Sequence, residues 1–232
     1  MTTTADRAPA VLFDIDGTLV DSNYLHVHAW GRAFRDSGVE ADAWRIHRSI
    51  GMDGSRLVAS LAPDADDDTR QRLKDLHSRY YKELSPGLRL LPGGRDILEA
   101  VAAMGLQVVL ATSAPEDELS ILRAVLDRDS IVAAVTSAAD VDVAKPDPGI
   151  VEVALDRAGV TADRAVLVGD AVWDAVASVR AGVPMVGLLS GGVSGAELTE
   201  AGAGAVFADA RELTEHLDET TIARLRSGAE DA

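Results

Sequence analysis

The sequence predicts an α/β fold in which a doubly wound, parallel, Rossmann-like sheet forms the core and a small four-helix unit is inserted. Short apolar runs end at polar residues, and helical patterns of about 10 residues stand between these runs. Such alternation is typical of βαβ units, which build parallel sheets. The alternation is interrupted once, after the first apolar run, by a stretch without a convincing strand.

The apolar runs predict six strands. Residues 10–13 are apolar and stop at Asp14, as expected for a strand that is buried on both faces. The other strands are predicted at residues 106–111, 131–135, 165–168, 184–189 and 205–208.

Four helices are predicted between these strands. Helix 116–126 follows Pro115 and begins with acidic residues, which the helix dipole favours. Gly159 and Gly182 are suitable C-caps for the helices preceding them. The four helices cover residues 95–104, 116–126, 147–158 and 171–181.

The stretch without strands contains amphipathic segments at residues 24–36, 43–49, 54–61 and 69–84. We therefore expect a core domain made of residues 1–22 and 88–232, and a helical domain made of residues 23–87. The aromatic side chains expected in the interior of the helical domain are those of Trp30, Trp44, Tyr80 and Tyr81.

Composition narrows the possible partners and location. The chain has 232 residues, a formal net charge of −16 and no cysteine, so it has no disulfides or thiolate chemistry. The negative charge makes nucleic acid and anionic membranes unfavourable partners. No apolar run is long enough to span a membrane, and residues 1–9 lack the layout of a signal peptide. We expect a cytoplasmic protein.

Polar side chains follow several of the predicted strands. In a doubly wound sheet, ligands bind at the carboxyl ends of the strands. A cluster of carboxylates there requires a cation, and hard oxygen ligands favour Mg²⁺. Taken singly, each Asp could be a helix N-cap and the Lys a surface residue. The candidates are Asp14, Asp16, Thr112, Ser113, Lys145, Asp170 and Asp174.

These residues, in this order, resemble the haloacid dehalogenase superfamily of phosphohydrolases. The resemblance rests on the segment from Asp14 to Ser22, on Thr112 at a strand end, on Lys145-Pro146, and on the Gly169-to-Asp174 motif. It covers nearly the whole chain and is nearest to the phosphoglycolate phosphatase and β-phosphoglucomutase-like branch. In that branch an inserted helical cap domain covers the sheet. The resemblance implies a Mg²⁺-dependent phosphatase that acts on a small phosphorylated metabolite.

The resemblance also implies roles for the reacting groups. Asp14 is expected to attack phosphorus and form an aspartyl-phosphate. Asp16 is expected to protonate the leaving alcohol and later to activate water. Thr112 and the backbone N–H of Ser113 are expected to bind phosphate oxygens, and Lys145 to offset negative charge in the transition state.

The magnesium ligands that the resemblance implies come from the first and the last of these motifs. The side chains of Asp14 and Asp170 and the carbonyl of Asp16 are expected to bind the ion. Asp174 lies one helical turn after Asp170 and is expected to act through water or by supporting the ligands.

Two residues of the cap are weaker candidates for substrate binding. His26 stands where β-phosphoglucomutase has a functional histidine, although it could be an ordinary interface residue. Arg56 lies two residues after the position of that enzyme's cap-loop arginine. A phosphosugar mutase is therefore an alternative to the phosphatase, and a non-catalytic protein that binds phosphorylated metabolites is an alternative of a different class.

Overall fold

The core of the protein is a parallel six-stranded sheet. It is seen in a computed structural model that describes residues 7–140 and 145–227. The strand order is β3-β2-β1-β4-β5-β6, and each neighbouring pair is parallel. The strands are β1 (Ala10–Phe13), β2 (Gln107–Leu110), β3 (Val132–Val135), β4 (Ala165–Gly169), β5 (Met185–Leu188) and β6 (Ala205–Phe207).

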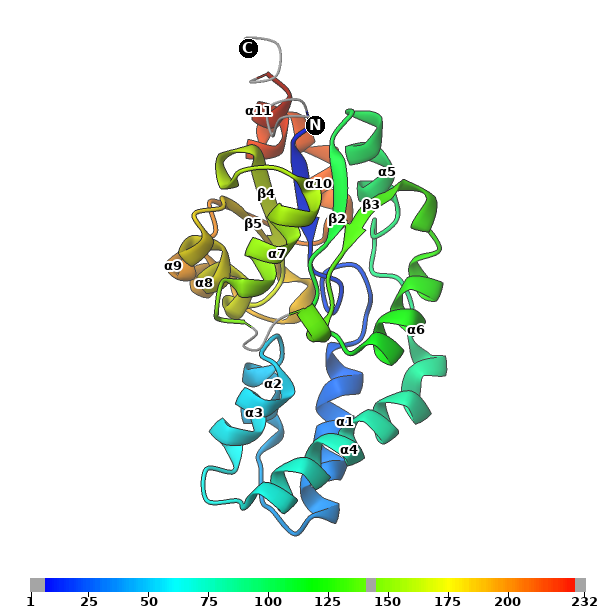
Figure 1. Cartoon of the computed structure of the whole chain (residues 1–232), viewed down its shortest axis with the longest axis vertical. Helices are drawn as coiled ribbons and strands as arrows, with labels where there is room; N and C mark the ends of the chain where they lie inside the picture. The colour runs from blue at the N-terminus through cyan, green and yellow to red at the C-terminus, as the bar shows by residue number, and fades with distance from the viewer. Residues whose placement is uncertain (1–6, 141–144, 228–232) are drawn as a thin grey trace.

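Helices cover both faces of this sheet (Figure 1). Side chains of β1 alternate between the two faces, because successive residues of a strand point in opposite directions. Val11 and Phe13 join a cluster with α5, α6, α10 and α11, whereas Ala10 and Leu12 join a cluster with α7 and α8. The helices of the core are α5 (Asp96–Ala103), α6 (Glu116–Leu126), α7 (Gly149–Ala158), α8 (Val172–Ala181), α9 (Gly195–Ala201), α10 (Ala210–Glu215) and α11 (Thr221–Ser227).

Four helices lie beyond one end of the sheet, below it in Figure 1, and the chain enters them soon after β1. Their buried side chains form a hydrophobic cluster separate from the two clusters of the sheet. Leu88 packs against this cluster and against one sheet cluster, at the return to the core. The helices are α1 (Asn23–Asp36), α2 (Ala43–Ser49), α3 (Gly54–Leu61) and α4 (Asp67–Leu84).

The predicted fold class is confirmed, and no end of a predicted element is shifted by more than two residues. Helices α9, α10 and α11 were not predicted. The expectation for Trp44 was wrong: its side chain is 67% exposed, whereas Trp30, Tyr80 and Tyr81 are buried. Trp44 is the second residue of the short helix α2, and only Ile46 and Ser49 of that helix are buried.

Two expectations concern chain ends and membranes. Residues 1–6, on which the expectation of no signal peptide partly rests, lie outside the described residues. Within the described ranges, no helix combines the length and apolar character needed to cross a bilayer.

Candidate active site

The candidate site lies where the strand order reverses. Strand β1 has β2 on one side and β4 on the other, so the connections leave it in opposite directions. In open α/β sheets this switch point leaves a crevice outside the carboxyl ends of the strands. Asp14 follows β1 directly and Asp170 follows β4 directly, so the sheet brings together two residues far apart in sequence.

Three buried carboxylates meet at this crevice. Ligand atoms of Asp14, Asp170 and Asp174 all lie within 4.8 Å of one another. Asp174 is in the first turn of α8, and its Oδ2 accepts a hydrogen bond of 3.0 Å from the backbone N–H of Ala171. The Nζ of Lys145 lies 2.5 Å from Asp14 Oδ1 and 2.7 Å from Asp174 Oδ1. One lysine therefore faces three carboxylates.

Asp170 is held by residues from the segment after β1. Thr18 Oγ1 donates a hydrogen bond of 2.7 Å to Asp170 Oδ1, and Asn23 Nδ2 donates one of 2.9 Å to Oδ2. Two glycines leave room for this carboxylate. A Cβ on Gly191 would stand 1.7 Å from Asp170 Oδ2, and one on Gly17, where φ is +77°, would stand 2.4 Å from it.

Burial sets the proton affinities of the cluster. It raises the pKa of Asp14 well above its ordinary value, against the opposing effect of Lys145. Burial, together with the charge of Asp174, raises the pKa of Asp170 to about 7. Burial would lower the pKa of Lys145, but Asp14 and Asp174 raise it further, so the ammonium stays charged. The negative charges of the cluster exceed the positive charge of Lys145.

The donor set of this cluster fits a divalent cation. Carboxylate oxygens are hard ligands, and a buried excess of negative charge is relieved by an ion of charge 2+. Asp14, Asp170 and Asp174 are the residues that would hold it. The expectation that four carboxylates converge was wrong for the side chain of Asp16, which lies outside this group. The expected part of the Asp16 carbonyl in metal binding stays a prediction.

The carboxylate of Asp16 instead forms a second cluster with α1. Ser22 Oγ donates a hydrogen bond of 2.5 Å to Asp16 Oδ1, and His26 Nε2 lies 3.3 Å from the same oxygen. Burial would raise the pKa of Asp16, but His26 and Ser22 hold it below its ordinary value. Burial would lower the pKa of His26, but Asp16 raises it overall. Each of the two groups therefore favours the charged form of the other.

Aromatic rings pack behind His26. Its ring stacks on Tyr81 with 4.0 Å between centroids, and its Nδ1 lies 3.0 Å from His77 Nε2. His77 stacks on Trp30 at 4.1 Å. Burial, followed by the charge of His26, lowers the pKa of His77 well below its ordinary value. His77 is therefore the neutral partner. His28 is exposed, as expected for a residue two positions from His26 on a helix.

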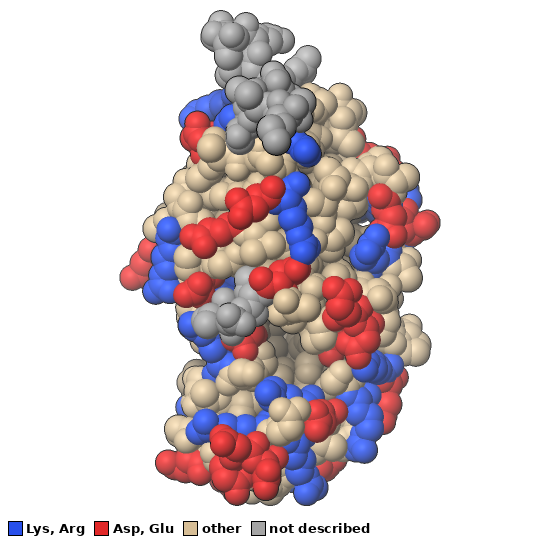
Figure 2. All heavy atoms as spheres, in the orientation of Figure 1, with Lys and Arg blue, Asp and Glu red and all other residues tan. Residues whose placement is uncertain are grey.

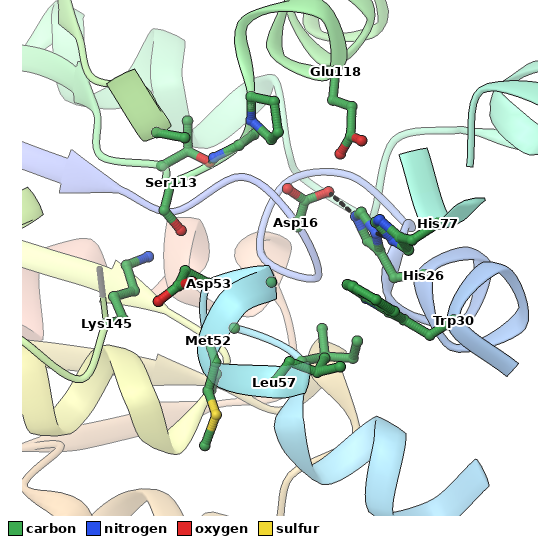
Figure 3. Close-up of a pocket in the computed structure, with 18 of the residues that line it drawn as sticks. Asp16, His26, Trp30, Met52, Asp53, Leu57, His77, Ser113, Glu118 and Lys145 are labelled. Carbon is green, nitrogen blue, oxygen red and sulfur yellow. Dashed lines mark hydrogen bonds and ion pairs between the residues drawn. The ribbon is translucent and has the colours of Figure 1, made fainter. Parts of the chain in front are cut away.

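A cavity of about 370 Å³ separates the sheet from the helical unit. Its lining includes the predicted residues Asp14, Asp16, His26, Thr112, Ser113, Lys145 and Asp170. Figure 3 shows Asp16, Ser113 and Lys145 on the sheet side, and Trp30, Met52 and Leu57 on the helical side. The two clusters therefore open into one space.

Two predicted site residues are absent from the cavity lining: Asp174, which belongs to the buried acidic cluster, and Arg56. Its Nε lies 3.9 Å from Asp53 Oδ2, one turn earlier on α3. Thr112 is buried at the end of β2, and its Oγ1 accepts a hydrogen bond of 3.1 Å from the N–H of Ala114.

Sequence reasoning missed several residues of the site. Thr18 and Ser22 belong to the motif that carried the resemblance, but neither was assigned a contact. Asn23 was placed just before a helix, with no sign that its amide reaches Asp170. Glu118 was counted among acidic residues favoured by the dipole of its helix. Its position four residues before the buried Leu122 was the one available sign that it faces inward.

Comparison with known proteins agrees with this geometry. Residues 11–188 match the family model described as haloacid dehalogenase-like hydrolase. The chain is 33% identical over 218 residues to a phosphoglycolate phosphatase of Rhodospirillum rubrum, covering 90% of each chain. It is 30% identical over 201 residues to a phosphorylated carbohydrates phosphatase of Thermotoga maritima, covering 84% of this chain and 91% of the relative.

A solved structure gives the same result. The crystal structure of a hydrolase from Pseudomonas syringae superposes with a TM-score of 0.87 at 37% identity, covering 91% of this chain and 98% of that chain. The family match covers most of the chain. The chain therefore belongs to the haloacid dehalogenase-like hydrolases, and it is an enzyme of that class.

Proposed function

We propose that this chain is a Mg²⁺-dependent phosphatase that hydrolyses a small phosphorylated metabolite through an aspartyl-phosphate on Asp14. The observation that carries the proposal is the position of Asp14. Its carboxylate borders the cavity, belongs to the buried acidic cluster and contacts the buried ammonium of Lys145. This grouping supports the proposal, because a nucleophile, a charge-compensating lysine and metal ligands must lie close together for this reaction.

In the first step, one oxygen of the Asp14 carboxylate attacks phosphorus while the bond from phosphorus to the leaving oxygen breaks. Asp16, which contacts His26, gives a proton to that leaving oxygen, which departs as an alcohol. Lys145 offsets the negative charge of the phosphoryl group, together with Thr112 and the N–H of Ser113. A bound Mg²⁺ would neutralise part of the same charge.

In the second step, Asp16 accepts a proton from a water molecule, and the resulting hydroxide attacks the phosphorus of the aspartyl-phosphate. The acyl–phosphate link breaks, phosphate leaves, and Asp14 is regenerated as a carboxylate. No oxidant or further reactant is needed. Asp16 gives one proton in the first step and takes one in the second, which agrees with its contact to a titratable histidine.

The surface does not attract a phosphorylated substrate as a whole. The net charge is −16, and on the face shown in Figure 2 acidic and basic side chains are interspersed. Attraction must therefore come from the site, where Lys145 is 1% exposed. We keep the expectation of a cytoplasmic protein without nucleic-acid or membrane partners as a prediction from the sequence.

We also propose that residues 23–87 act as a cap on a core made of residues 1–22 and 88–232. Support comes from the separate hydrophobic cluster of the four helices and from their contribution of Trp30, Leu57 and His77 to the cavity lining. A cap in this position excludes bulk water from the reacting groups when it closes.

The test is phosphate release from p-nitrophenyl phosphate with Mg²⁺ and with EDTA. We expect activity that requires Mg²⁺, and a fall of at least about a thousandfold in Asp14→Asn, because an amide is a poor nucleophile. Asp21→Asn is the matched control, since Asp21 lies seven residues later, outside the cavity lining, where it pairs with Arg89 at 3.7 Å. Full activity in Asp14→Asn would end the assignment.

The same assay separates the alternatives. A phosphosugar mutase would give isomerised sugar phosphate in place of free phosphate, and a non-catalytic binder would bind phosphorylated metabolites without releasing phosphate. The position of Arg56 outside the cavity lining favours the phosphatase.

A further inference from the structure

We propose that Glu118 selects the leaving group, so that the enzyme prefers phosphate monoesters of uncharged, hydroxylated compounds of the sugar or polyol class over esters that carry a carboxylate. This inference rests on the proposed phosphatase function and names the substrate class of the same site.

Glu118 is a buried carboxyl group that lacks a full set of partners. It lies in the first turn of α6, is 2% exposed and lines the cavity. Its Oε1 has no hydrogen-bond partner among the described residues. A buried acceptor without a partner is costly, and the cost is removed by a ligand that donates a hydrogen bond to it. Ligand hydroxyl groups supply such donors.

The surroundings of Glu118 place it at the leaving-group end of the cavity. Figure 3 shows it reaching from the core toward Asp16, His26 and His77, on the side of the cavity away from Lys145. His26, Asp16, Ser78 and Asp117 are the groups whose charges or hydrogen bonds act on it. Asp16 is the proposed proton donor to the leaving oxygen, so a group bound near Glu118 belongs to the alcohol and not to the phosphoryl group.

Charge at this end disfavours a second anion on the substrate. Glu118 and Asp16 both border the space that the alcohol would fill. A carboxylate on the alcohol would face two acidic groups and one histidine, His26, in a partly desolvated cavity, where like-charge contacts are costly. Lys74 of α4 also lines the cavity, with its Nζ 3.4 Å from Ser55 Oγ, and is a cation that could bind a substrate carboxylate. A carboxylate bound to Lys74 is therefore the competing arrangement.

The remaining wall suits the carbon face of a hydroxylated compound. Trp30, Leu57, Met52 and Ile50 line the cavity from the helical unit. Apolar and aromatic walls with few polar groups are typical of small-molecule sites, and about 370 Å³ lies within their usual size. Sugars and polyols present C–H groups to such a wall while their hydroxyls point to an acceptor.

The test compares kcat/KM for sorbitol 6-phosphate and glucose 6-phosphate with kcat/KM for 2-phosphoglycolate. The assays contain Mg²⁺ and are run at about pH 8, where the carboxyl group of 2-phosphoglycolate is ionised. We expect the better of the two hydroxylated substrates to exceed 2-phosphoglycolate by about tenfold or more in the wild type. Glu118→Gln removes the charge and keeps the shape of the side chain. The ratio of kcat/KM for the better hydroxylated substrate to kcat/KM for 2-phosphoglycolate should therefore fall by about fivefold or more.

Glu116→Gln is the matched control, because Glu116 makes the same charge change in the same turn of α6 but is exposed and outside the cavity lining. Its ratio should equal that of the wild type. Thermal unfolding of both variants confirms folding, and Lys74→Met tests the competing arrangement. If Lys74→Met alone moves the ratio, if Glu118→Gln moves it by less than about fivefold, or if wild type prefers 2-phosphoglycolate, the selection by Glu118 is wrong.

The outcome for the proposed function is separate. Mg²⁺-dependent turnover of p-nitrophenyl phosphate, lost in Asp14→Asn, establishes the phosphatase whichever substrate class is preferred. Absence of that turnover in the wild type overturns the phosphatase itself.

Discussion

At the scale of single residues, the candidate site depends on small side chains as much as on charged ones. Asp170 sits between Gly17 and Gly191, and the carbonyl of Gly17 accepts a hydrogen bond of 2.7 Å from Ser190 Oγ. The segments after β1 and β5 therefore approach each other around one carboxylate. Such close approach leaves no volume for a methyl group.

Gly191→Ala tests this packing. The added Cβ would stand 1.7 Å from Asp170 Oδ2, so the carboxylate must move from its place beside Asp14 and Asp174. We expect the concentration of Mg²⁺ needed for half-maximal activity to rise by about tenfold or more. The measurement is a Mg²⁺ titration of aryl phosphate hydrolysis.

Gly31→Ala is the control for that experiment. Gly31 lies inside α1, and a Cβ there meets nothing within 4 Å. Alanine is the better helix former, so this variant should keep its Mg²⁺ requirement and gain up to about 1 kcal/mol of stability. An unchanged Mg²⁺ requirement in Gly191→Ala would show that the loop adjusts without moving Asp170.

At the scale of elements, the helical unit contributes one wall of the cavity, and the short helix α3 is part of that wall. Helix α3 begins at the N-cap Asp53, whose Oδ1 accepts hydrogen bonds from the N–H groups of Ser55 and Arg56 at 2.7 and 3.2 Å. The same helix carries Leu57 into the cavity lining. The first turn of the helix that carries Leu57 is therefore held by one capping side chain.

We expect Asp53→Ala to lower the free energy of unfolding by about 1 kcal/mol, because the first turn of α3 loses its cap. KM should rise as well, since Asp53 itself lines the cavity and the wall beside it loses order. Asp53→Ser keeps a capping oxygen and should restore most of both losses. Denaturant unfolding and steady-state kinetics provide the two measurements.

Asp66→Ala separates stability from substrate binding. Asp66 caps α4 by accepting a hydrogen bond of 2.8 Å from the N–H of Thr69, and it lies outside the cavity lining. It should show the same loss of stability with an unchanged KM. A KM that rises equally in both variants would mean that the whole cap responds, and not the wall formed by α3.

At the scale of the whole molecule, the cap and the core meet through several contacts between distant segments. His47 Nε2 lies 3.0 Å from the carbonyl of Gly191, and Trp173 Nε1 donates a hydrogen bond of 3.2 Å to the carbonyl of Arg48. Arg48 also pairs with Glu197 of α9. Because exposed ion pairs contribute about 1 kcal/mol or less, the Arg48–Glu197 pair adds little to the stability of this contact.

Stability of the molecule should respond to pH and Mg²⁺ together. The pKa of Asp170 is raised to about 7 by burial and by Asp174. A raised carboxyl pKa contributes stability that is fully present below the ordinary value near 4 and is lost as pH rises through about 7. Mg²⁺ binds the ionised carboxylates, so it should raise the melting temperature more at about pH 8 than at about pH 5.5.

Thermal unfolding with Mg²⁺ and with EDTA at the two pH values checks this expectation. Asp170→Asn should lose most of the Mg²⁺-dependent rise at the higher pH, because one ligand and its titration are removed together. An equal rise at both pH values in the wild type would contradict a raised pKa for Asp170.

The sequence by itself determined the features of this protein that depend on neighbouring residues. The periodicity of apolar residues and the residues that mark the ends of elements are local signals. They located all six strands, the helices up to α8 and the polar residues at the strand ends. The motif order identified the family. Helices α9 to α11 were missed, although Ser194 with Glu197 and Asp209 are local capping signals at the starts of α9 and α10. The exposure of Trp44 was missed because packing partners decide it.

Only the tertiary structure decided which polar residues meet. Strand order places β4 beside β1, which joins Asp170 to Asp14 and Asp174, while the segment after β1 turns the Asp16 carboxylate toward His26. The fold of the cap onto the core also lines the cavity with Glu118 and with Trp30 from the helical unit, and leaves Arg56 outside the lining. Sequence spacing records neither sheet order nor cap placement, and both depend on contacts between distant parts of the chain.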